Sequence, residues 1–360
     1  MSFDRIAILG LGKVGRLAAE LLHESGLEVT GVDAHPVSGL PFAFKTADLT
    51  GESGLRQALT GQQAVLSCLP WHLNKGVSSA AHGLGLHYFD LTEDVGTTNH
   101  IRALAETSKG LMAPQCGLAP GFVGIVAADL ARHFGKVRSI RMRVGALPRH
   151  PTGLLGYAFN WSPEGVVNEY LNDCEVIEHG VRKTVTAMEW TEKLFIDGNE
   201  LEAFTTSGGL GTMCETYEGV IENLDYKTIR YPGHVKLMNF FFHELLMRER
   251  RADAGQILTH AKPPVDDDVV YIHVSAEGWI DGNLRRKEFV RAYHTREIAG
   301  KERTAIAWTT SASAAAVIEM TRKGALPAQG FLKQETVPLD AFFATRTGSF
   351  FLAGRGGHTA

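Results

Sequence analysis

The first third of the chain alternates short apolar runs with stretches whose apolar residues recur at helical spacing. Residues 5–9 form a compact apolar run that predicts a strand, and residues 14–22 have the spacing of a helix. A second β-branched run, residues 27–32, closes on Asp33. Strand, helix and strand make one βαβ unit, and this connection makes the two strands parallel.

The same alternation continues through residue 113. Further strands are predicted at residues 64–69, 86–91 and 110–113, and helices at residues 53–59 and 74–84. Alternation of this kind predicts an α/β fold class, with a Rossmann-type, doubly wound parallel sheet.

The pattern changes beyond residue 121. A helix is predicted at residues 122–134, and alternating residues predict a half-buried strand at 137–144. Later come strand-like runs at residues 184–190, 269–276 and 289–293, a glycine-rich loop at 207–209 and a helix at 235–250. This mixture predicts a second, α+β domain.

The end of the chain begins with an alanine-rich stretch of helical spacing, residues 310–322. Gly324 and Pro327 follow it as helix-stop signals. Such a helix can return to the first domain, and the glycine-rich residues 354–357 are expected to fray. The expected division is a Rossmann domain at 1–120, an α+β domain for substrate binding and dimerisation at 121–305, and a returning C-terminal segment at 306–360.

Composition excludes several classes of protein. With 44% hydrophobic residues, 21% charged residues and a net charge of -4, the chain is an ordinary globular protein without the basic surface that nucleic-acid binding needs. The sequence has no apolar stretch of about 20 residues and no signal peptide, so we expect a cytoplasmic protein without a membrane role. The four cysteines form no CxxC pair, and neither a metal site nor a disulfide is expected.

A glycine motif lies between the first predicted strand and helix, which is the context of a dinucleotide-binding turn. Gly10 permits the tight turn, and Gly12 lets the backbone approach a pyrophosphate. Gly15 lets the helix pack closely on the strand. Lys13 and Val14 open the helix, whose free N–H groups favour negative charge.

Asp33 ends the second strand, where a carboxylate can accept hydrogen bonds from the adenosine ribose hydroxyls. A 2′-phosphate is repelled there, so the motif predicts NAD rather than NADP, a preference that protonated His35 softens. A glycine turn without a dinucleotide is the structural alternative. FAD and a methyltransferase cofactor are the alternative ligands, and a second flavin motif is not evident.

Several longer strings resemble the saccharopine dehydrogenase-like family. They are CGLAPG at residues 116–121, GALP at 145–148, GYAFNWSPEG at 156–165, LEAFTTSGG at 201–209 and TIRYPGH at 228–234. Within the family the chain is most similar to the branch that oxidises the ε-amino carbon of lysine with NAD. The resemblance implies an amino-acid or amine substrate and a homo-oligomer, a dimer or larger.

Glu164 departs from the saccharopine-forming branch, which carries an arginine here for a substrate carboxylate. A glutamate would repel that carboxylate and suits an ammonium group instead. Ser162, Pro163 and Glu164 also resemble a helix N-terminus with an early acid, and this structural interpretation is as strong as the functional one.

The other catalytic candidates come from the ends of predicted strands. Asp90 is the first choice for a base near the substrate, because the resemblance places an acid there. Glu93 and Asp94 more simply cap the next helix. The resemblance also implies that Cys68, Leu69 and Pro70 contact the cofactor, that Cys116 and Gly117 line the substrate pocket, and that Tyr157 binds substrate; His72 is more simply a solvated loop residue.

Arg230 and His234 frame a distinctive turn of the second domain. Arg230 can bind a substrate α-carboxylate through a two-pronged contact, or form an ordinary ion pair. His234 can act as an acid or base, or satisfy a backbone carbonyl. Asn168 and Glu169 are weaker candidates. A saccharopine or carboxynorspermidine-type reductase, a dehydrogenase of another diamine and a non-catalytic dinucleotide-binding sensor remain alternatives.

Overall fold

The computed structural model describes residues 3–353, which form two compact units. The first unit contains residues 3–125 and 307–353, and the second contains residues 126–306. The expected frayed tail at residues 354–357 lies outside the described residues. Within the described part of the chain, the helices are too short or too polar to cross a membrane.

The first unit is built on a seven-stranded parallel sheet. Its strands are β1 (Arg5–Leu9), β2 (Glu28–Asp33), β3 (Ala43–Thr46), β4 (Ala64–Ser67), β5 (His87–Asp90), β6 (Leu111–Ala113) and β17 (Gly330–Phe331). They lie in the order β17-β6-β5-β4-β1-β2-β3, which confirms the predicted Rossmann-type sheet. The order reverses between β1 and β4, and in open α/β sheets ligands bind at the carboxyl ends of the strands at such a point.

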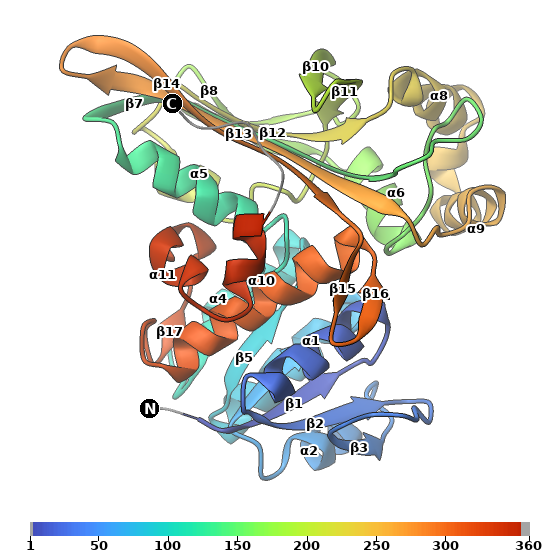
Figure 1. The fold of residues 1–360 in the computed structure, drawn as a ribbon, viewed down its shortest axis with the longest axis vertical. Coiled ribbons are helices and arrows are strands. Elements are labelled where there is room, and N and C mark those ends of the chain that lie inside the picture. Colours follow the sequence, from blue (N-terminus) through green and yellow to red (C-terminus); the bar gives the residue numbers. More distant parts are fainter. Residues whose placement is uncertain (1–2, 354–360) are drawn as a thin grey trace. The chain divides into compact units, whose positions relative to one another are not determined.

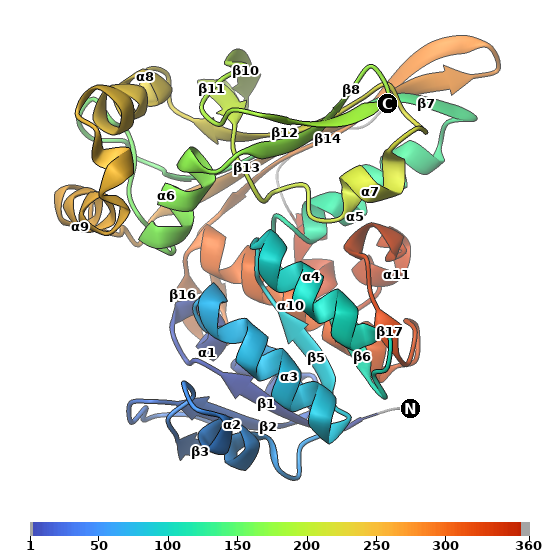
Figure 2. The same ribbon diagram turned by 180° about the vertical axis from the view of Figure 1, so that it is seen from behind.

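Helices cover both faces of this sheet. The bounds are α1 (Lys13–Glu24), α2 (Glu52–Leu59), α3 (Asn74–Leu84), α4 (Val95–Ala105), α10 (Ala305–Arg322) and α11 (Leu339–Phe343). Helices α1 and α10 lie on one face (Figure 1), and the Ser311 hydroxyl of α10 donates to the Val14 carbonyl of α1 at 2.8 Å. Helices α3 and α4 lie on the other face (Figure 2). Strands β1 and β4 are almost entirely buried between these layers, as expected for a parallel sheet.

The second unit is built on a mixed eight-stranded sheet. Its strands are β7 (Lys136–Pro148), β8 (Cys174–Glu178), β9 (Val181–Val185), β10 (Glu192–Ile196), β11 (Asn199–Thr205), β12 (Asn223–Arg230), β13 (Asp268–Ile280) and β14 (Asn283–His294). The main path is β10-β11-β12-β7-β13-β14, in which only β12 and β7 are parallel. Helices α6 (Pro163–Leu171), α7 (Met213–Tyr217), α8 (His234–Asn239) and α9 (Arg251–Ala261) and the small hairpin of β15 (Arg296–Ile298) and β16 (Lys301–Arg303) complete it; α5 (Phe122–Arg132) spans the boundary between the units.

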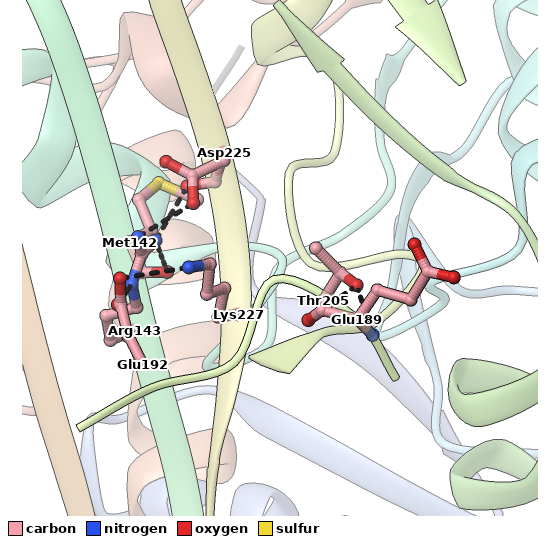
Figure 3. Close-up of polar contacts among 7 residues, drawn as sticks. All are labelled: Met142, Arg143, Glu189, Glu192, Thr205, Asp225 and Lys227. Atoms are coloured by element: carbon pink, nitrogen blue, oxygen red, sulfur yellow. Dashed lines mark hydrogen bonds and ion pairs between the residues drawn. The ribbon is translucent and has the colours of Figure 1, made fainter. Parts of the chain in front are cut away.

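The hairpin of β10 and β11 bends back over the sheet. Glu192 of β10 reaches Arg143 on β7, although β11 and β12 separate these strands in the sheet order (Figure 3). Arg143 and Lys227 are register partners on β7 and β12, and both are buried. Glu192 binds both cations, with a 2.9 Å contact to Lys227 Nζ, and Asp225 binds Arg143 at 2.7 Å. Two buried cations are thereby balanced by two carboxylates.

Two predicted elements of the second unit end earlier than predicted, whereas the strands predicted at 137–144, 269–276 and 289–293 are longer in the structure. The run at residues 184–190 is a strand only to Val185, since Met188 and Trp190 have positive φ and form a turn. Thr205 ties this turn down by accepting from the Glu189 N–H at 3.0 Å (Figure 3). The helix expected at residues 235–250 becomes a π-helical turn after Asn239, and it ends where Leu246 has a φ of 57°.

Candidate active site

The glycine turn has the geometry that its three glycines predict. Gly10 has a φ of 84°, and its N–H donates to the Val32 carbonyl at 2.9 Å. A Cβ on Gly15 would lie 1.9 Å from the Gly10 carbonyl oxygen, so only glycine lets α1 pack this closely. A Cβ on Gly12 would meet nothing within 4 Å, which leaves open space in front of the turn.

The N-terminus of α1 is free to receive an anion. Gly12 occupies its N-cap without a capping side chain, and the first turn contains no acidic residue. Gly12 and Lys13 are exposed, and Val14 is half-buried. Unsatisfied N–H groups and the helix dipole favour a phosphate at such an end. The residues present therefore fit the pyrophosphate of a dinucleotide.

Asp33 is fixed at the end of β2 by two backbone donors. Its Oδ2 accepts from the Leu11 N–H at 2.7 Å, and its Oδ1 accepts from the His35 N–H at 3.0 Å. The first bond ties the acid directly to the glycine turn. Each carboxylate oxygen keeps lone pairs for a further donor, as two ribose hydroxyls require. His35 is exposed.

The loop after β4 packs against the same turn. A Cβ on Gly10 would approach the Cys68 carbonyl oxygen and the Leu69 side chain at 3.0 Å each, and Pro70 next along the chain is exposed. Burial, with the nearby Asp90 carboxylate, raises the pKa of the Cys68 thiol to about 12. Cys68 therefore stays a neutral thiol, and its contribution is to the shape of the turn.

Asp90 lies at the carboxyl end of β5 and is 0% exposed. Its carboxylate accepts from the Tyr88 hydroxyl at 2.7 Å and from the N–H groups of Thr92 and Gln115 at 3.0 Å each. Burial raises its pKa to about 6, although these hydrogen bonds oppose the shift. In this structure Asp90 holds together the loops that follow β5 and β6.

The next two acids have different surroundings. Asp94 is the N-cap of α4, and its carboxylate accepts from the Thr97 N–H at 2.6 Å, which confirms the capping interpretation for this residue. Glu93 is half-buried, and burial together with Asp90 and Asp94 raises its pKa to about 6. Glu93 thus combines access with a pKa close to neutral, which the capping interpretation did not anticipate.

Cys116 and Gly117 form the buried loop after β6. The Cys116 thiol is fully buried and donates to the Ala113 carbonyl at 3.1 Å. Gln334, which sequence reasoning missed, donates from Nε2 to Pro114 at 2.8 Å and to the Cys116 sulfur at 3.3 Å. Burial and Asp90 raise the pKa of Cys116 well above its usual range, so a nucleophilic thiolate is not formed here.

In the second unit, Arg230 is the centre of a buried polar cluster. Only 2% of Arg230 is exposed. Its Nε donates to the Tyr170 hydroxyl at 2.7 Å, and Nη1 donates to the Ile229 carbonyl at 2.8 Å. The guanidinium carbon lies 4.5 Å from the centre of the Tyr157 ring, in cation–π geometry. A two-pronged contact with a substrate would have to break one of these hydrogen bonds.

His234 belongs to the same cluster and is also buried. Its Nε2 lies 2.9 Å from the Tyr170 hydroxyl, and its Nδ1 lies 3.0 Å from the Leu155 carbonyl oxygen. Burial and the charge of Arg230 lower its pKa to about 3. Both ring nitrogens therefore have partners, in agreement with the carbonyl-binding interpretation.

Glu202 is a further member of this cluster that sequence reasoning missed. Its carboxylate accepts from the N–H groups of Gly233 at 2.9 Å and Val235 at 2.7 Å, and so fixes the turn that carries His234. The string LEAFTTSGG contains Glu202, but an alternating strand gives no signal that one acid points inward to a helix N-terminus.

Glu164 lies apart from these residues. It is exposed in the first turn of α6, after the Ser162 cap and Pro163. The Ser162 hydroxyl accepts from the Gly165 N–H at 3.1 Å, so the predicted helix start is confirmed. Asn168, one turn later, accepts from Arg251 of α9 at 3.0 Å.

The sequence profile of the saccharopine dehydrogenase C-terminal domain matches residues 117–345. The chain belongs to the saccharopine dehydrogenase-like family. Apo saccharopine dehydrogenase (L-Glu forming) from Saccharomyces cerevisiae has a similar fold, with a TM-score of 0.74 and 16% identity over 94% of this chain and 96% of the yeast chain.

Two other solved structures share the fold of this family member. C. glutamicum DAP dehydrogenase in complex with DAP has a TM-score of 0.51 and 10% identity over 98% of this chain and 99% of its own. An engineered D-amino acid dehydrogenase bound to NADP+ has a TM-score of 0.52 and 10% identity, with the same coverage. Membership of the saccharopine dehydrogenase-like family makes this chain a Rossmann-type oxidoreductase.

The predicted site residues of this family member form separate groups. In the first unit the structure brings together the three motif glycines with Asp33 and the Cys68 loop, and Asp90 with the Cys116 loop; these two groups adjoin, since Asp90 is close enough to Cys68 to raise its pKa. In the second unit it joins Tyr157, Arg230 and His234 but leaves Glu164 outside their cluster. The structure adds three residues to these groups that the sequence did not predict: Tyr170, Glu202 and Gln334.

Proposed function

We propose that this chain is an L-lysine 6-dehydrogenase. It would oxidise the ε-amino carbon of L-lysine with NAD and water, giving the 6-semialdehyde, ammonia and reduced nucleotide, and the aldehyde would cyclise to piperideine-6-carboxylate. The observation that carries the proposal is the family match together with a glycine turn bonded directly to Asp33. The lysine assignment rests on the resemblance and on Glu164.

The first unit supplies the cofactor site in this proposal. The free N-terminus of α1 and the open space at Gly12 would hold the pyrophosphate, and Asp33 would hold the ribose. A 2′-phosphate next to Asp33 would place like charges together, which supports NAD over NADP. The nucleotide supplies the hydride acceptor.

The reaction also needs a base, because the substrate amine must lose a proton before its carbon gives up hydride. We propose Glu93 for this step in place of Asp90, the first choice from the sequence. Both acids have a pKa raised to about 6, but the Glu93 side chain is partly exposed whereas Asp90 is 0% exposed. Asp90 holds the loops around it. Cys116 and Gly117 would shape the substrate pocket without covalent chemistry.

Recognition of the substrate is assigned to both of its charged ends. Glu164, whose carboxylate is exposed, would attract the ε-ammonium group. Arg230, with Tyr157 stacked on it, would attract the α-carboxylate through the nitrogen that has the weakest internal bond. Each role is a proposal about binding, and neither residue exchanges protons.

A substrate panel tests the function. Lysine, ornithine, diamines and saccharopine are each supplied with NAD and with NADP, and reduced nucleotide is measured by absorbance. We expect lysine with NAD to give the highest kcat/KM. If saccharopine gave the highest kcat/KM, the lysine assignment would be overturned in favour of the saccharopine-type reaction. That alternative is motivated by the similar fold of the yeast enzyme.

The same panel separates an enzyme from a sensor. A nucleotide that raises the melting temperature while none of the amines is oxidised would identify a dinucleotide-binding sensor. A homo-oligomer and a cytoplasmic location stay predictions from the resemblance and composition.

A further inference from the structure

The hydrogen bonds between Arg230, Tyr170, His234 and Leu155 run in one direction. The Leu155 carbonyl can only accept, so Nδ1 of His234 must carry the hydrogen across the 3.0 Å contact. A neutral imidazole has one N–H, and Nε2 is therefore an acceptor. The Tyr170 hydroxyl accordingly donates to Nε2 and accepts from Arg230 Nε at 2.7 Å.

The neutral state of His234 follows from its surroundings. Arg230 on β12 contributes a positive charge, and Tyr157, Tyr170 and Phe204 surround the ring. Glu202 faces the backbone of the turn rather than the ring, because both of its oxygens accept from backbone N–H groups. Burial and the charge of Arg230 hold the pKa of His234 at about 3. A histidine of this kind connects hydrogen bonds and does not exchange protons at neutral pH.

The bonds of Arg230 are unevenly distributed over its nitrogens. Nε donates to Tyr170, and Nη1 donates to the Ile229 carbonyl and, at 3.3 Å, to Thr228 Oγ1. Nη2 has a single 3.5 Å contact, to the Tyr157 hydroxyl, at the outer limit of a hydrogen bond. The guanidinium is thus anchored on one side. Because Arg230 is only 2% exposed, a carboxylate reaches Nη2 by displacing the Tyr157 hydroxyl, its weakest partner.

We propose that Tyr170 and His234 are positioning residues, which lock the guanidinium of Arg230 so that Nη2 receives the carboxylate of the amino-acid substrate. This inference rests on the proposed function and names the group that binds the carboxylate. An orientation fixed before binding removes the entropy cost of immobilising an arginine side chain. The bond to the carboxylate is charge-assisted, which favours a carboxylate over a neutral amide.

Tyr170→Phe tests the position of the hydroxyl. The ring and its packing remain, and only the link between Arg230 and His234 is lost. We expect KM for lysine to rise about tenfold, the worth of one hydrogen bond to a charged group, while kcat and KM for NAD stay within about threefold. Lysinamide, which keeps the amine but lacks the carboxylate, is measured alongside, and its KM should not change.

Tyr293→Phe is the matched control. Tyr293 of β14 is another buried tyrosine of this unit, and its charged neighbour is Arg291 rather than Arg230. It should leave KM for lysine within about twofold of the wild type. An equal rise of KM in both variants would point to a general loss of packing and overturn the inference.

Substitutions of His234 separate positioning from acid–base catalysis. In His234→Gln the amide oxygen can accept from Tyr170, so KM should stay within about threefold of the wild type. His234→Asn is too short to reach Tyr170 and should behave like Tyr170→Phe. Loss of kcat by about a hundredfold in both variants, with KM unchanged, would make His234 an acid or base and overturn the inference.

Failure of the proposed function looks different. If wild-type protein oxidises another amine or amino acid but not lysine, the lysine assignment fails, and the same KM comparison is made with that substrate and its amide or decarboxylated analogue. If lysine is oxidised and Tyr170→Phe keeps the wild-type KM, the positioning inference fails alone.

Discussion

The charged residues of this protein differ in how much folding free energy their burial costs. Asp90 is the clearest case, because its carboxylate is fully buried and its three donors are neutral. A folded-state pKa of about 6 against an ordinary 3.8 means that the folded state holds the proton more tightly than the unfolded one. Stability therefore falls as pH rises from about 4 through about 6.

Asp90→Asn should remove that cost. Its Oδ1 can accept from Thr92 and Gln115, and its Nδ2 can donate to the Tyr88 oxygen. We expect the variant to be more stable than wild type by about 2–3 kcal/mol at pH near 7, with no difference at pH near 4. Urea unfolding across this pH range measures it. A difference that does not vary with pH would contradict the burial of an ionised Asp90.

Glu164→Gln tests the two interpretations of an exposed first-turn acid. The dipole contribution alone is worth about 0.3–1 kcal/mol in stability and nothing in KM. If Glu164 attracts the ε-ammonium, KM for lysine should rise about fivefold with kcat nearly unchanged, since the loss is in binding. An unchanged KM, with a small loss of stability in chemical unfolding, would show that Glu164 only stabilises the N-terminus of α6 and does not bind substrate.

The predictable residues are those whose role depends on local chain geometry. The motif glycines, Asp33 and the Ser162 cap each follow a strand or begin a helix, and the sequence pattern shows both. The polarity of the Arg230 cluster was not predictable, because Tyr170 and Glu202 point inward only when α6, β11 and α8 have packed.

At the scale of elements, the bent hairpin of β10 and β11 is the least regular part of the second unit. Its strands pair normally with each other, but Glu192 also crosses the sheet face to two buried cations. Burial alone would raise the pKa of Glu192, yet Arg143 and Lys227 outweigh it and hold the pKa at about 2. The carboxylate stays charged at any ordinary pH.

Glu192→Gln should loosen this hairpin. Removing one of the two anions leaves Arg143 and Lys227 poorly balanced, and we expect a loss of about 2 kcal/mol, below the value for a fully buried pair because Glu192 is partly solvated. Hydrogen exchange in β10 and β11 should rise along with the loss in chemical stability. Glu200→Gln is the control, since the pair of Glu200 with Lys193 on the same hairpin is exposed and should contribute under about 0.5 kcal/mol. Equal effects would refute the role of the buried cations.

The hairpin also shows where sequence patterns lose information. Helices α3 and α6 begin where the sequence signals place them, and the parallel strands of the first unit follow from βαβ alternation. The strand predicted at 184–190 failed because Met188 and Trp190 adopt positive φ without glycine, held by Thr205 from a distant strand. A contact between segments far apart in sequence decides that turn.

For the whole molecule, the two units should respond differently to acid. His234 in the second unit has a folded pKa of about 3, so the unfolded chain takes up a proton first as pH falls below about 6.5. His234 alone costs the second unit about 2 kcal/mol between pH about 7 and about 5. His273, whose pKa is lowered by burial, adds to this loss, whereas Asp268, whose pKa is raised by burial, opposes it. In the first unit His87, with its pKa lowered to about 4 by burial, acts the same way, but the raised pKa values of Asp90 and Glu93 act oppositely.

We therefore expect the second unit to become the less stable one near pH 5. Hydrogen exchange followed by mass spectrometry at pH near 7 and near 5, corrected for the intrinsic rates, resolves the two units by their peptides. In His234→Gln the pH dependence of the second unit should weaken. Parallel loss of protection in both units would show that their titrating groups are not as separate as these environments indicate.

The first unit is made from two segments that are far apart in the sequence, residues 3–125 and 307–353, and this affects how it folds during synthesis on the ribosome. Strand β6 emerges roughly 200 residues before β17, its partner, a delay on the order of tens of seconds at ordinary synthesis rates. The partners of Phe122 are synthesised after a similar delay. These are Phe342 and Phe351, and the Phe351 ring stacks on that of Phe122 with 4.0 Å between the ring centres. The continuous second unit ends at residue 306, before β17, so the nascent chain can complete its middle before its beginning, and the exposed apolar surface of the unfinished first unit is what chaperones would meet.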